Sequence, residues 1–177
     1  MAQEKRKKKF FDVEIPLIGK ETQMQAYELS ELDGRFLRYD LTRILRGKSI
    51  MLTLKVKVEK NEAITIPKKI ELMPYSLRRM VRKGTNYVED SFSAENKDSN
   101  LKIKPLLVTR RKVSRAIRKE LRNKAREEII SYVKDKTSEE LFDEILKSQL
   151  QKYLSLKLKK IYPLALCEIR ILEAKEK

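Results

Sequence analysis

The chain has 177 residues, of which 42 are Lys or Arg and 26 are Asp or Glu, so its formal net charge is +16 at pH 7. Such an excess destabilises the compact state by self-repulsion, and a chain that keeps it is expected to have an anionic partner. One cysteine and no histidine exclude an internal disulfide, zinc sites built on histidine or paired cysteines, and catalysis by histidine. The lone Cys167 lies in an apolar run, which indicates a buried, unreactive thiol in a reducing cytoplasm. No run approaches the roughly 20 apolar residues of a membrane span, and no signal peptide or membrane partner is expected.

Residues 1–9 form a basic block that is predicted to be disordered on its own. It contains Lys5, Arg6, Lys7, Lys8 and Lys9. We expect an arm that lies on phosphate groups, and a solubilising tail is the alternative.

The next part of the chain is rich in predicted strands. Phe10–Ile18 is expected to be the first strand. Met24–Leu32 and Arg35–Leu41 flank Asp33-Gly34, whose residue types favour the positive φ angles of a tight hairpin turn. The sequence therefore predicts a hairpin at this dipeptide.

Two further strands follow, and the first has the clearest pattern in the chain. Over Ser49–Glu59, apolar residues alternate with polar ones, which is typical of a strand with one buried face. Glu62–Leu72 continues this pattern, although Pro67 restricts it to a sheet edge or a bulge.

A short basic helix is predicted over Pro74–Lys83, because Pro74 suits a first helical turn and Gly84 suits a cap. Its cations form a second basic patch, made of Arg78, Arg79, Arg82 and Lys83. Two strands are then expected, Asn86–Glu95 and Leu101–Thr109. The polar residues between them favour a second hairpin.

The last third is predicted to be helical, with a final strand. One helix is expected over about Arg111–Lys134. The next follows a capping box formed by Thr137 and Glu140 and runs to about Lys160. The chain is then expected to return as a strand over Leu164–Leu172.

The run Arg110–Arg126 is the strongest functional signal, because nine of its residues are Arg or Lys and one, Glu120, is an acid. At 100° per residue, one side of a helix would gather Arg111, Arg115, Arg118, Lys119, Arg122 and Arg126, and the other Val113, Ala116, Ile117 and Leu121. Like charges one turn apart repel, and a nucleic acid would remove that cost. A solvated face is the alternative, yet ion-pair networks need both signs of charge.

The predicted RNA-binding residues thus belong to three groups, the arm, the short helix and the basic run. They are Lys5, Arg6, Lys7, Lys8, Lys9, Arg78, Arg79, Arg82, Lys83, Arg110, Arg111, Lys112, Arg115, Arg118, Lys119, Arg122 and Arg126.

The sequence predicts no catalytic residue, metal or cofactor, because it has no phosphate-cradling glycine loop, metal-ligand cluster or nucleophile elbow. Two acid pairs, Asp12 with Glu14 and Glu89 with Asp90, could be assigned to a metal or acid–base site. The polar faces or ends of strands explain them more simply. Most aromatic residues are expected in the core or an interface. One or two are candidates for stacking on an unpaired base, and the sequence does not say which.

Four segments in this order resemble one family: Lys8-Lys9-Phe10-Phe11-Asp12-Val13, Asp33-Gly34-Arg35-Phe36, the strand and basic run Leu101–Arg126, and Ile161-Tyr162-Pro163-Leu164. The chain resembles the archaeal and eukaryotic (e-type) small-subunit ribosomal protein that carries the number one. The resemblance extends from about Lys8 to Leu172, and the length is similar to that of archaeal members.

The resemblance implies an α+β fold, in which helices pack at the C-terminal side of an antiparallel, partly barrel-like sheet. It implies a structural, non-catalytic protein on the platform of the small subunit, near the mRNA exit channel. The implied partners are small-subunit ribosomal RNA, neighbouring ribosomal proteins of the platform, and mRNA at the exit channel, all in the cytoplasm.

Together, the residues and the resemblance predict a ribosomal protein that binds ribosomal RNA through phosphate contacts and folded shape. The predicted layout is a basic arm over residues 1–9 and a single α+β domain over 10–177, β-rich over 10–109, helical over 110–160, with a last strand over 164–172. Two alternatives stay open, a free-standing nucleic-acid-binding protein and an RNA-processing enzyme.

Overall fold

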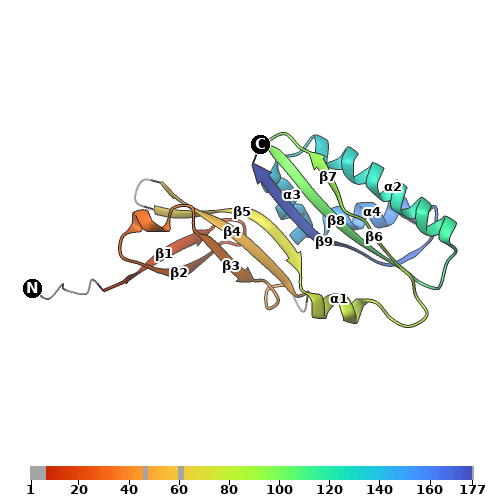
Figure 1. The fold of residues 1–177 in the computed structure, drawn as a ribbon, viewed down its shortest axis with the longest axis horizontal. Coiled ribbons are helices and arrows are strands. Elements are labelled where there is room, and N and C mark those ends of the chain that lie inside the picture. The colour runs from red at the N-terminus through yellow and green to blue at the C-terminus, as the bar shows by residue number, and fades with distance from the viewer. Residues whose placement is uncertain (1–6, 46–47, 60–61, 177) are drawn as a thin grey trace, which may run out of the picture. The chain divides into compact units, whose positions relative to one another are not determined.

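The computed structural model describes residues 7–45, 48–59 and 62–176 (Figure 1). Its elements are β1 (Lys9–Ile15), β2 (Lys20–Ala26), η1 (Leu29–Leu32), β3 (Phe36–Asp40), β4 (Ile50–Glu59), β5 (Glu62–Leu72), α1 (Pro74–Met80), β6 (Tyr87–Glu89), β7 (Phe92–Glu95), β8 (Ser99–Thr109), α2 (Arg115–Lys134), α3 (Ser138–Leu146), α4 (Gln149–Leu158) and β9 (Leu164–Glu176). This content confirms the α+β class.

The chain divides into two compact units, which are described separately below. The smaller unit comprises residues 1–39 and 53–68, and the larger comprises 40–52 and 69–177. The prediction of one domain over 10–177 stays a prediction.

In the smaller unit, β1 is the strand that links its neighbours. It pairs antiparallel with β2, from Lys9 opposite Ala26 to Ile15 opposite Lys20, and parallel with β5 at Val13 and Glu14. The β1–β2 hairpin was not predicted. A core of small and branched side chains fills the inner face: Val13, Ala26, Leu32, Val56 and Ala63.

The hairpin predicted at Asp33-Gly34 is wrong. The preceding strand ends at Ala26, η1 follows it, and β3 pairs with β4 instead of β2. Gly34 does have a positive φ of 75°, but its amide donates to the carbonyl of Val56 (2.9 Å). The Asp33 carboxylate accepts from the amide of Val58 (3.2 Å). Asp33 and Gly34 therefore form a turn that is hydrogen-bonded to β4. Their residue types favour the backbone angles of a turn but do not determine which strand the turn contacts.

In the larger unit, the long antiparallel pair β8–β9 forms the centre of the sheet, from Ser99 opposite Glu176 to Thr109 opposite Leu164. Strands β6 and β7 also pair antiparallel with β8, and the end of β5 pairs with β9. The ladder shifts register between Lys104 and Pro105, where proline lacks the N–H that a regular ladder needs. The predicted hairpin is confirmed, although its first strand, predicted over Asn86–Glu95, is divided into β6 and β7. The predicted final strand is also confirmed and extends to Glu176.

The expected sheet differs from the observed one in two details. Because β1 and β5 run parallel, the sheet is mixed and not wholly antiparallel. In the part of the chain that the structure describes, the strand order begins at β2 and stops at β6, so the sheet does not close into a barrel. Pro67 lies where β5 changes partner from β1 to β9.

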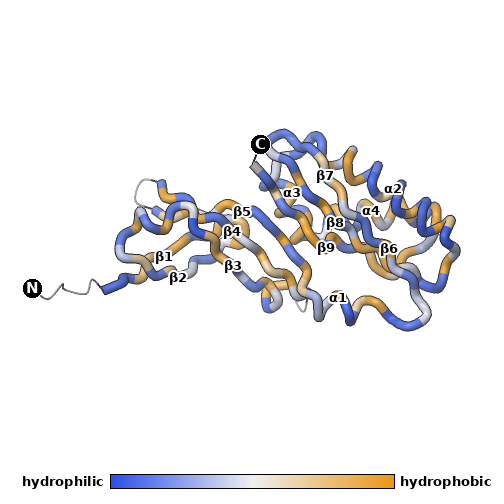
Figure 2. The backbone as a smooth tube through the Cα atoms, viewed as in Figure 1, coloured by the Kyte–Doolittle hydropathy of each residue, from blue (hydrophilic) through white to orange (hydrophobic). Residues whose placement is uncertain are grey.

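Helix α2 begins at Arg115, four residues later than predicted. Ser114 caps it by accepting a hydrogen bond from the amide of Ile117 (3.4 Å). Its buried side chains recur at every fourth position, at Leu121, Ala125, Ile129 and Val133. Figure 2 shows hydrophobic and hydrophilic stretches alternating along α2. α2 packs against β6, β7 and α4.

The helix predicted up to Lys160 is two helices, α3 and α4. The capping box is confirmed, with the Thr137 hydroxyl and the Glu140 carboxylate each accepting from the other residue's amide. The helix then breaks at Ser148, whose φ is 58°, and the ammonium group of Lys48 donates to its hydroxyl (3.1 Å). No helix within the described residues is both long enough and apolar enough to cross a membrane.

We expect Leu121→Ala to lower the free energy of unfolding by about 2–5 kcal/mol, because it leaves a cavity where the side chain is 0% exposed. Ile130→Ala, on the same helix but 38% exposed, should cost under about 1 kcal/mol. Urea denaturation followed by circular dichroism measures both. Equal costs would contradict the described packing of α2.

Candidate nucleic-acid interface

Hydrogen bonds between Asn86 and Thr109 hold together two loops of the larger unit. The Thr109 amide donates to the Asn86 carbonyl (2.8 Å), and the Asn86 amide donates to the Thr109 hydroxyl (3.0 Å). The Asn86 side-chain oxygen accepts from the amide of Val113 (2.8 Å). The Thr109 hydroxyl also lies 2.7 Å from the carbonyl oxygen of Arg111. The segment before β6 is thus fastened to the segment that leads into α2.

This fastening brings two predicted basic patches together. Arg82 and Lys83 stand just before Asn86, in a turn where the Thr85 hydroxyl donates to the Arg82 carbonyl (2.7 Å). Arg110, Arg111 and Lys112 directly follow Thr109. We call these five cations, Arg82, Lys83, Arg110, Arg111 and Lys112, the basic junction. All five are exposed.

The structure corrects the predicted positions of several of these residues. Arg110, Arg111 and Lys112 precede α2, so Arg111 is not part of its basic face. Similarly, α1 ends at Met80, and Arg82 and Lys83 lie beyond it. The anchored loops, and not helical periodicity, therefore position the junction.

The basic face of α2 is largely as predicted. Arg115, Lys119, Arg122 and Arg126 are exposed. Arg118 is half-buried, and its Nε is shielded from solvent with no hydrogen-bond partner among the described residues. On the opposite side, Leu121 is buried as expected. Ala116, which was expected beside Leu121, is exposed.

Acidic partners are found for only some cations near this surface, among the residues that the structure describes. Lys124, which was not predicted to bind RNA, is paired with Glu127 (3.3 Å) and Glu128 (3.5 Å). The hydrogen bonds that the Lys124 ammonium donates to Glu127 and Glu128 raise the pKa of Lys124. Within the described ranges, none of the predicted RNA-binding residues of the larger unit forms such an ion pair. Their charge is therefore available to an external anion.

The remaining candidates lie on α1 and in the arm. Arg78 and Arg79 are exposed on the last turn of α1, and the Arg79 guanidinium lies over the ring of Tyr75, 5.6 Å from its centroid. Lys7, Lys8 and Lys9 belong to the smaller unit, where Lys8 lies 5.7 Å from the ring centroid of Tyr27. Lys5 and Arg6 fall outside the described residues.

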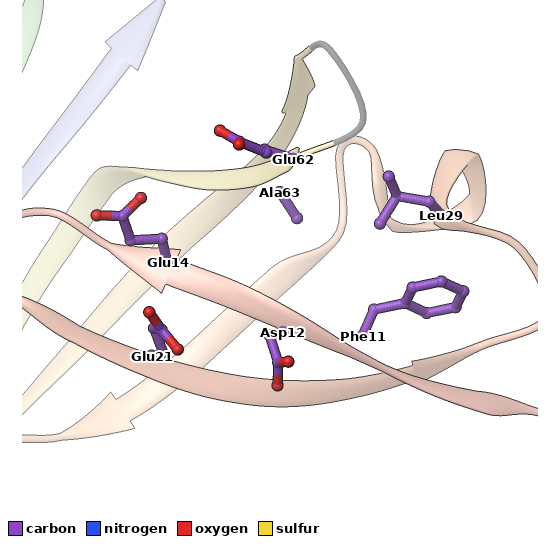
Figure 3. A pocket seen from close by; sticks show the side chains of 7 residues that line it. All are labelled: Phe11, Asp12, Glu14, Glu21, Leu29, Glu62 and Ala63. Carbon is purple, nitrogen blue, oxygen red and sulfur yellow. The ribbon is translucent and has the colours of Figure 1, made fainter.

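The smaller unit contains a hollow of the opposite charge (Figure 3). Its volume is about 360 Å³, and it is lined by Phe11, Asp12, Glu14, Glu21, Leu29, Glu62 and Ala63. Glu14 and Glu21 are directly opposite each other in the β1–β2 ladder, an arrangement that repels a phosphate. The carboxylates of this hollow therefore do not favour the binding of a phosphate.

In each acid pair considered for a metal or acid–base site, at least one carboxylate accepts a hydrogen bond from a neighbouring residue. Asp12 accepts from the amide nitrogen of the Gln23 side chain (3.0 Å), and Glu89 accepts from Arg170 (3.1 Å). The structured ranges contain no group of three or more potential ligands that could hold a metal. Cys167 is buried as predicted, and burial raises its pKa to about 12.

Sequence patterns missed Asn86 and Thr109, the residues that position the junction. Asn86 begins one predicted strand and Thr109 ends another, and neither position by itself indicates a functional role. They are 23 residues apart, so no local signal relates them.

Comparison with known proteins identifies the chain's relatives. The model of the ribosomal S3Ae family matches residues 2–176. This chain belongs to the ribosomal S3Ae family. The resemblance seen in the four sequence segments is thereby confirmed, and membership of a ribosomal protein family indicates a structural protein and not an enzyme.

Three archaeal relatives share the name small ribosomal subunit protein eS1. The chain is 26% identical to that of Nanoarchaeum equitans, over 97% of this chain and 92% of the relative. It is 35% identical to that of Methanothermobacter thermautotrophicus, over 55% of this chain and 52% of the relative. It is 30% identical to that of Pyrobaculum aerophilum, over 74% of this chain and 60% of the relative.

We expect Asn86→Ala to free the loop between β8 and α2. The change leaves the Val113 amide without its acceptor, which should cost about 1–3 kcal/mol of unfolding free energy and speed amide hydrogen exchange over residues 109–113. Asn86→Asp keeps an acceptor oxygen and should retain most of the protection. Unchanged exchange at Val113 in the alanine variant would show that Asn86 does not anchor the loop.

Proposed function

We propose that this protein is a structural constituent of the small ribosomal subunit that binds ribosomal RNA with its larger unit. The observation that supports this most is the basic junction, where hydrogen bonds hold five exposed cations on two loops. Ordinary stability does not require such a concentration of like charge, since self-repulsion opposes it. RNA phosphates would offset the repulsion and release condensed counterions.

The start of α2 adds to the attraction for phosphate. A helix carries partial positive charge at its N-terminus, where its first amide groups lack helical partners. Ser114 accepts from one of these amides, and Arg110, Arg111 and Lys112 stand directly before it. The exposed Arg115 and Arg122 extend the positive surface along the helix. Arginine suits this role because its planar guanidinium can bind two phosphate oxygens at once.

We also propose where this protein lies in the ribosome and what it contacts there. The names of the relatives support association with small-subunit ribosomal RNA and with neighbouring ribosomal proteins in the cytoplasm. The family resemblance supports a position on the platform near the mRNA exit channel, with mRNA as a further contact. There the protein would help to shape the exit region, and so support subunit assembly and translation.

Reversing two charges on α2 tests the surface. We expect Arg115→Glu with Arg122→Glu to weaken binding to ribosomal RNA by at least about tenfold, because two attractive phosphate contacts become repulsive. Both residues are exposed, so the fold should persist. They are better targets than the half-buried Arg118. Filter binding measures affinity, and circular dichroism checks the fold.

The matched control is Lys134→Glu with Lys152→Glu, which makes the same change in net charge at exposed positions outside the proposed surface. Equal losses in both double variants would mean that net charge alone governs binding. In cells, the parent protein should sediment with the small subunit at moderate salt. Sedimentation as a free protein would support the free-standing alternative.

The salt dependence of binding is a second test. Each neutralised phosphate contributes about 0.7–0.9 to the slope of log affinity against log salt concentration. Several contacts at the junction and α2 should therefore give a slope of at least about 4 in a KCl series. A slope near 1 would contradict a surface built on several phosphate contacts.

A further inference from the structure

Tyr87 is an exposed aromatic residue directly beside the anchored loops. It is the first residue of β6 and follows Asn86 in the chain. Its side chain is 53% exposed. In the described part of the chain it makes no side-chain hydrogen bond, ion pair or ring contact, so the exposed part of its ring has no polar or aromatic partner.

The other aromatic residues near the basic surfaces are already engaged. Arg79 covers Tyr75. Tyr132 and Tyr153 lie with their ring centroids 5.0 Å apart, and the Tyr153 hydroxyl donates to Glu128 (2.8 Å). Phe92 lies under Arg126 and is buried. Tyr87 is therefore distinguished by an exposed ring without such contacts.

The strand pairing places Tyr87 next to both loops of the basic junction. Tyr87 is opposite Val108 in the β6–β8 ladder, two residues before Arg110. Upstream, Lys83 is four residues away along the turn that Thr85 closes. Because the Asn86 side chain accepts from the Val113 amide, the ring is anchored to the same backbone that carries Arg110, Arg111 and Lys112.

We infer that Tyr87 stacks on an unpaired base of the RNA whose phosphates bind the basic junction. This inference rests on the proposed function and specifies the ligand as an unpaired nucleotide in a loop, bulge or tail. A base within a duplex is stacked between its neighbours and presents no free face, whereas an unpaired base can leave the stack. Every base has such a face, so stacking tolerates different sequences.

The surrounding charge favours a nucleotide over an apolar protein partner. An exposed tyrosine can also anchor a protein interface, but a protein partner would have to supply acids for the junction cations. One nucleotide supplies both components, a phosphate for the cations and an aromatic face for the ring.

Two RNAs with equal phosphate charge test the inference. Both carry the same hairpin and the same single-stranded tail, which has adenines in one and abasic riboses in the other. The parent protein should bind the adenine tail about tenfold more tightly, as expected for one stacked base. Tyr87→Ala should lose this preference without weakening the abasic complex, and Tyr87→Phe should keep it, since it retains the ring.

Two results would overturn the inference: an unchanged preference in Tyr87→Ala, or an equal loss of affinity for both RNAs. Phe36→Ala is the control, because it removes a ring that is 63% exposed in the smaller unit, and it should leave the preference intact. A similar loss in this variant would also contradict a site at Tyr87. Circular dichroism melts confirm that the variants fold.

Comparing Tyr87→Ala with the double arginine variant distinguishes a failure of this inference from a failure of the proposed function. If Tyr87→Ala has no effect while Arg115→Glu with Arg122→Glu still weakens binding, the stacking site is wrong and the phosphate surface stands. If neither change has an effect, both are wrong.

Discussion

The antiparallel pairing of β8 with β9 is the interaction on which the larger unit depends. β8 also pairs with β6 and β7, and its Leu101 and Ile103 are fully buried. The pairing thus supplies the sheet against which α2 and α4 pack. β8 ends at Thr109, which is hydrogen-bonded to Asn86 just before β6. The β8–β9 ladder therefore also fixes the position of the cations in the basic junction.

Opposite charges are distributed unevenly over this scaffold. The buried Glu168 is paired with Lys48 (2.7 Å), and Lys136 is paired with Glu144 between partly buried side chains. By pairing with these cations, Glu168 and Glu144 stabilise the packing of the helices. The junction, in contrast, is held by hydrogen bonds of uncharged groups, chiefly those of Asn86 and Thr109. Its shape therefore needs no acid nearby, and its cations are left for a ligand.

This arrangement suits recognition by surface charge and shape. The family assignment indicates a structural role, and the features that support RNA binding lie on exposed loops and one helix face. The acidic hollow of the smaller unit has the wrong charge for phosphate, so the proposed contacts gather on the larger unit. If Tyr87 adds base stacking there, phosphate attraction and recognition of an unpaired nucleotide share one rigid support.

The sequence by itself determined features that depend on near neighbours. The alternation along Ser49–Glu59 predicted β4, Thr137 with Glu140 predicted the start of α3, and the charge excess predicted an anionic partner. Only the tertiary structure decided how the strands pair beyond the β7–β8 hairpin, where α2 begins, and that Asn86 joins two basic patches. The reason is physical: local residue types set backbone angles and caps, whereas pairings across many residues depend on how the whole core packs.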